Sequence, residues 1–134
     1  MSVSSYLLVG LGSAFGGMAR FGVSDIVARL SAPDGGSGFP WGTLAANVSG
    51  CFLIAFLAVL ALADGRPLLD LTARQFLMVG VLGGYTTFSA FGLQTLELAL
   101  AGDWGSAGLN VALSLVLCLG AVWLGWLAGV AVNG

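Results

Sequence analysis

Four long stretches of this chain carry no charged side chain: residues 1–19, 35–63, 75–96 and 104–134. Each is about as long as the ~20 apolar residues that a helix needs to cross a bilayer, or longer. Four arginines and six acidic residues make up the 7% of charged side chains, whereas a soluble surface has about 25–35%. We therefore predict an all-α integral membrane protein, in which residues 1–134 form one domain of four transmembrane helices near residues 4–29, 40–63, 72–99 and 105–131.

The composition also excludes several classes of protein. Hydrophobic residues make up 58% of the chain, which rules out a soluble globular domain and a disordered chain. The sequence has no lysine, so the basic surface of a nucleic-acid-binding protein is missing and no nucleic-acid partner is expected. It has no histidine, the commonest metal ligand and general base. Cys51 and Cys118 fall within apolar stretches, so we interpret them as small buried residues and not as a disulfide or metal pair.

Residues 80–91 (GVLGGYTTFSAF) predict a break in the third helix. Gly83 and Gly84, followed by the β-branched Thr86 and Thr87, are poor helix formers. Irregular backbone at membrane depth is tolerated only where it is buried in protein or lines a cavity. The carbonyl groups that such a break frees can become ligands for a cation.

The first helix carries one charge after nineteen uncharged residues, the guanidinium of Arg20. Because this charge follows the apolar stretch, we predict a retained helix and not a cleaved signal peptide. Arg20 either reaches to the lipid headgroups or forms a positive vestibule that concentrates anions. Gly16 lies one turn before it and Gly12 two turns before it, a spacing typical of close helix packing.

The second and fourth helices each place polar residues on one face. Asn47 lies about two turns into the second helix, where its amide either bonds another helix or contacts a permeating species. The fourth helix carries a stripe at i+4 spacing, which either forms bonds between helices or provides a polar track: Ser106, Asn110, Ser114 and Cys118. Phe88 and Phe91 share a face just past the break, and their ring edges carry the partial positive charge that suits a small anion.

Three motifs, in this order, resemble those of the Fluc (CrcB) fluoride channels: Gly16-x-x-x-Arg20, Trp41-Gly42-Thr43-Leu44-x-x-Asn47-x-x-Gly50 and Gly80-x-x-Gly83-Gly84-x-Thr86-Thr87-Phe88-Ser89-x-Phe91. The resemblance covers essentially the whole chain, including its length and its four spans. It implies a passive fluoride exporter in the inner membrane of a prokaryote. It also implies an antiparallel, dual-topology homodimer with two narrow pores and a structural sodium ion at its centre. We expect close contacts through Gly12, Gly16 and Gly17 to favour the assembly of its two subunits.

The resemblance assigns roles to individual residues. Asn47 would donate its amide to fluoride, and Phe88 and Phe91 would supply ring edges to the pore. The remaining residues of the implied fluoride pathway are Thr87, Ser89, Ser114, Asn110, Cys118 and, at the vestibule, Arg20. Gly83 and Thr86 would offer backbone carbonyls to sodium.

Three positions depart from the family pattern. Asn110 stands where many relatives have tyrosine, and Cys118 stands where a hydroxyl often continues the track. Gln94 stands where glutamate is common. The first two departures leave the course of the polar track open, and the third leaves open any ion-triggered role at that position.

Two other functions are compatible with a four-span chain of this length. A small dual-topology, proton-coupled multidrug transporter is also built from four helices, but it needs a membrane-embedded carboxylate. Here Asp25 and Glu97 lie near the predicted helix ends. The other alternative is a purely structural membrane subunit, which predicts no selective flux from purified protein.

Overall fold

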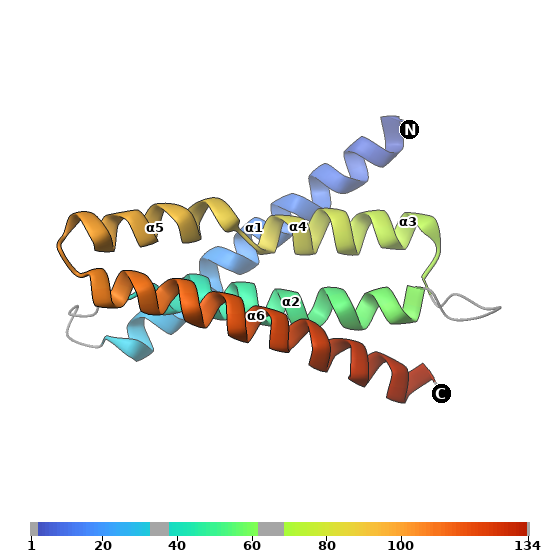
Figure 1. The fold of residues 1–134 in the computed structure, drawn as a ribbon. Coiled ribbons are helices and arrows are strands. Elements are labelled where there is room, and N and C mark those ends of the chain that lie inside the picture. Colours follow the sequence, from blue (N-terminus) through green and yellow to red (C-terminus); the bar gives the residue numbers. More distant parts are fainter. Residues whose placement is uncertain (1–2, 33–37, 62–68, 134) are drawn as a thin grey trace.

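The computed structural model describes residues 3–32, 38–61 and 69–133 of the chain. It contains four helices that are long and apolar enough to cross a membrane, Val3–Ser31, Trp41–Ala61, Leu71–Leu100 and Trp104–Val132. This confirms the all-α, four-span prediction. The predicted helix bounds agree with the structure to within two residues, except that residues 62–63 lie outside the described part of the chain. The N-terminus, the end of the second span, the start of the third and the C-terminus lie at one end of the bundle (Figure 1).

Three of the spans run side by side, and α1 (Val3–Ser31) crosses them obliquely (Figure 1). Helix α2 (Trp41–Ala61) packs along α6 (Trp104–Asn133). The third span is built from four pieces: α3 (Leu71–Arg74), the π-helix η1 (Gln75–Leu82), α4 (Gly83–Tyr85) and α5 (Phe88–Leu100).

Local capping fixes the ends of these helices. Asp70 accepts a hydrogen bond from the Ala73 amide (2.7 Å) and so caps α3. Helix α5 ends in a tight turn at Gly102, whose φ of +83° glycine adopts without steric cost. Asp103 then caps α6, and hydrogen bonds from the Ser106 side chain and backbone hold the pKa of Asp103 below its ordinary value.

The predicted break in the third span is confirmed, but the glycines do not form it. Gly83 and Gly84 are helical, and the extended residues are Thr86 (φ −86°, ψ 156°) and Thr87 (φ −154°, ψ 117°). The break is visible as a narrow link between α4 and α5 (Figure 1). Extended backbone suits β-branched residues, which accounts for the position of the break.

The glycines instead allow α1 to approach the third span closely. A Cβ atom at Gly84 would lie 2.5 Å from the carbonyl oxygen of Ser13, and one at Gly12 would lie 2.6 Å from that of Phe76. Small residues of this kind let helix backbones meet in membranes. The η1 segment lies in this contact, and no feature of its sequence had predicted a π-helix.

The contacts of Gly12 and Gly16 correct one expectation about assembly. Both glycines were expected, with Gly17, to pack against a second subunit. The structure buries Gly12 and Gly16 against η1 and α4 of the same chain, because α1 crosses the third span there. A Cβ atom at Gly17 would meet nothing within 4 Å, so for this residue the expectation stays a prediction.

Gly16→Ala is expected to lower the folding stability sharply, while Gly17→Ala is expected to change it little. A Cβ atom at Gly16 would overlap the carbonyl oxygen of Val81, and a backbone atom cannot swing aside. Overpacking of this kind costs about 1–3 kcal/mol. Thermal unfolding in detergent measures both variants. Equal melting temperatures for the two would contradict the close packing of α1 on the third span.

Candidate functional site: a pocket at the break in the third span

Asn47 on α2 holds the extended backbone at the break. Its Nδ2 donates to the Thr87 carbonyl oxygen (3.0 Å), and its Oδ1 accepts from the Thr87 amide (2.8 Å). One carboxamide therefore satisfies both backbone groups of a residue that has left the helix. This is how the chain meets the requirement that backbone polar groups be paired at membrane depth. The second Nδ2 proton of Asn47 remains for another acceptor.

The side chain of Thr87 starts the next helix. Its Oγ1 accepts from the Ala90 amide (3.2 Å), which caps α5, and it also contacts the Ser89 hydroxyl (3.2 Å). Ser89 is exposed, so this pair of hydroxyls lies at the surface of the break. Helix α5 begins here, so the partial positive charge of its N-terminus lies beside these two hydroxyls.

The two carbonyls predicted to bind sodium lose their helical donors at this break. In a continuous helix, the Thr87 amide would bond the Gly83 carbonyl and the Ala90 amide would bond the Thr86 carbonyl. The Thr87 amide donates to Asn47 instead, and the Ala90 amide donates to the Thr87 hydroxyl. The backbone oxygens of Gly83 and Thr86 are thus released, and oxygen donors are the ligands that hard cations such as sodium prefer.

A pocket of about 370 Å³ opens between α2, the break, the start of α5 and α6. It gathers six of the predicted pathway residues: Asn47, Thr87, Phe88, Phe91, Ser114 and Cys118. Thr86 also lines it, together with apolar residues such as Ile54 and Leu115. The pocket therefore presents neutral hydrogen-bonding groups within an apolar wall, and none of its lining residues is charged.

Phe88 and Phe91 lie together at this pocket. Their ring centroids are 5.2 Å apart and the planes are tilted by 50°. Phe88 is 81% exposed in the single chain, whereas Phe91 is partly buried. The ring of Phe88 therefore forms an exposed part of the pocket wall, and the ring of Phe91 a partly covered one.

Arg20 lies in a different pocket, which α1, α2 and α5 enclose. This second pocket of about 370 Å³ is also lined by Ser24, Thr43 and Gln94. Within the described part of the chain, Arg20 Nε and Gln94 Oε1 are buried without a hydrogen-bond partner. Arg20 does not line the pocket at the break, and its role at a vestibule stays a prediction.

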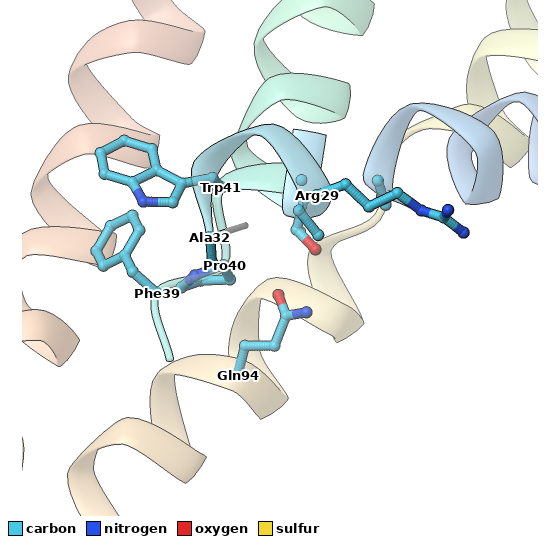
Figure 2. A pocket seen from close by; sticks show the side chains of 10 residues that line it. Arg29, Ala32, Phe39, Pro40, Trp41 and Gln94 are labelled. Carbon is cyan, nitrogen blue, oxygen red and sulfur yellow. The ribbon is translucent and has the colours of Figure 1, made fainter. Parts of the chain in front are cut away.

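Gln94 also faces a neighbouring hollow of about 430 Å³, where α1 ends and α2 begins. Figure 2 shows its carboxamide pointing toward this hollow, with the rings of Phe39 and Trp41 side by side on the other flank. The guanidinium of Arg29 extends away, and it pairs with Asp25 (3.0 Å) on the exposed side of α1.

Residues 7–126 match the family described as CrcB-like protein, Camphor Resistance (CrcB). A "Fluoride-specific ion channel FluC" from Opitutus terrae is 54% identical over 131 residues, covering 98% of this chain and 96% of that protein. Proteins of the same name from Methylocella silvestris and Paramagnetospirillum magneticum are 52% and 50% identical, each over 96% of this chain. This chain belongs to the CrcB family. With its four spans, it is a multi-pass prokaryotic membrane protein, as predicted.

In this CrcB protein, Asn110 does not reach the pocket at the break. It is buried at 2% exposure, and its Nδ2 donates to the Thr95 hydroxyl (2.8 Å), which in turn donates to the Phe91 carbonyl oxygen (2.7 Å). The structure therefore favours the alternative in which Asn110 bonds one helix to another. Through Thr95, this bond steadies the turn of α5 that carries Phe91.

Sequence reasoning missed the contacts that position the break from α2. Ser49 bonds the hydroxyl of Tyr85 (2.8 Å), and Gly50 leaves the space that the Thr86 methyl group fills. The pairing of Asn47 with Thr87 was also missed, because such contacts join residues far apart in the sequence. The one available signal was that Asn47, Ser49 and Gly50 cluster within four residues of a largely apolar helix.

Proposed function

We propose that this chain forms a passive fluoride channel in the prokaryotic cell membrane. The observation that carries the proposal is the pocket at the break, where Asn47, Ser114 and the two phenylalanines surround a space without charged groups. The curated relatives named fluoride-specific ion channel support it, since they match this chain over nearly its whole length.

The chemistry of the pocket suits fluoride. A pore must replace the water around this small, strongly hydrated anion, yet bind it weakly enough to release it. The free Nδ2 proton of Asn47, the Ser114 hydroxyl and the phenyl ring edges are neutral donors that meet both requirements. A fixed cation in the pocket would hold the anion too tightly, and Arg20 lies in the neighbouring pocket instead.

Nothing in the described residues favours the proton-coupled transporter. That mechanism needs a carboxylate that exchanges protons within the membrane. Asp25 is paired with Arg29 on the exposed side of α1, and Glu97 is exposed one turn from the end of α5.

The passive mechanism predicts that fluoride efflux is electrogenic. Proteoliposomes loaded with potassium fluoride should release fluoride quickly only after valinomycin provides a path for potassium. A pH gradient alone should not drive fluoride uphill. Efflux that requires proton exchange and ignores valinomycin would contradict the channel and favour a coupled transporter.

We further propose an antiparallel homodimer. The pocket at the break is open in the single chain and Phe88 is 81% exposed, so a second subunit can complete the wall. The order of the chain gives the arginines almost no orientation bias. Arg66 belongs to the connection between the second and third spans and Arg74 to the start of the third, whereas Arg29, and Arg20 if it reaches outward, belong to the opposite side of the membrane. Such a chain can insert in both orientations.

Added lysines test the dual topology. Two lysines in the 64–71 connection, or separately two in the 31–39 connection, should each fix the chain in one orientation and abolish fluoride flux. Co-expression of the two variants should restore flux, because opposite orientations are again available. Full flux from either variant alone would rule out the antiparallel dimer.

The proposed cofactor is a structural sodium ion at the dimer axis. The carbonyls of Gly83 and Thr86 fit it, because the break removes their helical donors, and two subunits would supply four oxygens. A bound cation would be coordinated by these oxygens, which lack helical donors, and would hold the two breaks together. A high-resolution map of the dimer should show one ion between these four carbonyls, and a map with the breaks far apart would refute the site.

A further inference from the structure

The two cysteines of the chain meet at the pocket. Cys51 on α2 and Cys118 on α6 are both free, both partly buried and both part of the pocket wall. Their thiols lie close enough to interact with each other across this wall. The sequence alone had suggested two small buried residues and no pair, because both fall within apolar stretches.

Tight packing between α2 and α6 holds the two thiols in place. A Cβ atom at Gly125 would overlap the carbonyl oxygen of Phe52, and one at Gly129 would lie 2.7 Å from Val59 Cβ. The two helix backbones therefore touch on the face that continues from Cys118. Two thiols on such a frame are prearranged, so a ligand that bonds both of them does not have to order them first.

The donor set limits which ligands suit this pair. Sulfur donors select soft metals and metalloids, whereas hard cations prefer oxygen. A structural zinc site needs four ligands, but the chain has no histidine and the described residues contain no group of three or more potential Cys, Asp or Glu ligands. Two sulfurs alone suit species that form two bonds to sulfur and complete their valence without further protein ligands.

We propose that Cys51 and Cys118 form a dithiol site for soft, thiophilic species that bond two sulfurs at once, represented by trivalent arsenic. With phenylarsine oxide, two As–S bonds form and the As–O bond breaks. The two thiol protons leave with the oxygen as one water molecule, and no atom is oxidised or reduced. The bridge would link α2 to α6 and place the arsenical in the pocket, beside Phe91 and Ser114.

Binding to purified protein tests the site directly. The probe is phenylarsine oxide in the presence of excess 2-mercaptoethanol, which displaces arsenic held by one thiol but not by two. Intact mass spectrometry should show one phenylarsenic per chain, removable by 2,3-dimercaptopropanol. Cys51→Ser and Cys118→Ser should each bind none. Absence of the adduct in the wild-type chain, or its retention in either variant, would overturn the proposal.

A flux measurement shows whether the dithiol lies on the conducting path, and this part rests on the proposed function. Each protein is compared with its own untreated rate in proteoliposomes. Phenylarsine oxide should slow wild-type fluoride efflux at least about tenfold and leave the rate of each serine variant unchanged. A wild-type chain that carries the adduct and still conducts at its untreated rate would support the dithiol site but contradict the assignment of this pocket to the fluoride path.

Discussion

Asn47→Ala should reduce fluoride efflux by at least about two orders of magnitude, which corresponds to about 2.7 kcal/mol in the barrier. The substitution removes both hydrogen bonds to Thr87, so the amide and the carbonyl of an extended residue are left unpaired beside an apolar wall. Each unpaired buried group costs about 1–3 kcal/mol. The proposed fluoride donor is lost at the same time.

Two further variants make this result specific. Asn47→Asp keeps the acceptor for the Thr87 amide but places a carboxylate oxygen against the Thr87 carbonyl, so it should also abolish flux. Ser49→Ala removes a bond between the same two spans, to the Tyr85 hydroxyl, outside the pocket. It should stay within about threefold of the wild-type rate. Equal effects at Asn47 and Ser49 would show that flux depends on the overall packing of the second span against the third, and not on the hydrogen bonds at the break.

Phe88→Ile and Phe91→Ile should each lower fluoride efflux at least about tenfold while leaving a folded protein. Isoleucine fills most of the volume of the ring and preserves apolar packing, but it has no polarised ring edge. The ring centroids are 5.2 Å apart at the pocket, so both ring edges should contact the same anion and either substitution should remove one of these contacts.

Phe15→Ile provides the matched control for the ring substitutions. Phe15 lies on α1, is 57% exposed and is not part of the pocket wall. Its replacement should leave efflux near the wild-type rate. If Phe88→Ile and Phe91→Ile behaved like Phe15→Ile, the rings would be packing residues and not part of the anion path.

The four spans could be predicted from the sequence because membrane insertion depends on local hydropathy. The break could be predicted as well, since poor helix formers are also a local signal. The position of the break within the motif could not be predicted. A glycine such as Gly84 can either interrupt a helix or allow a neighbouring helix to pack closely against it. Only the path of α1, which brings the backbone of Ser13 against Gly84, decides between them.

The gathering of the pocket residues was predicted in large part, but their partners were not. Asn47 was identified as a polar group that needed a partner, yet the Thr87 backbone became available only once the break had been placed. Asn110 could be interpreted as part of a polar track, because i+4 spacing shows which residues share a helix face. It does not show which residues of other helices contact that face. In the fold, that face meets Thr95.

The ratio of fluoride to chloride efflux tests the central claim most directly. Purified protein in liposomes loaded with equal potassium fluoride and potassium chloride, with valinomycin present, allows ion-selective electrodes to follow both anions. Fluoride should leave at least about a hundredfold faster than chloride, because the neutral donors of the pocket at the break suit the smaller anion. Comparable rates for the two anions would contradict the account.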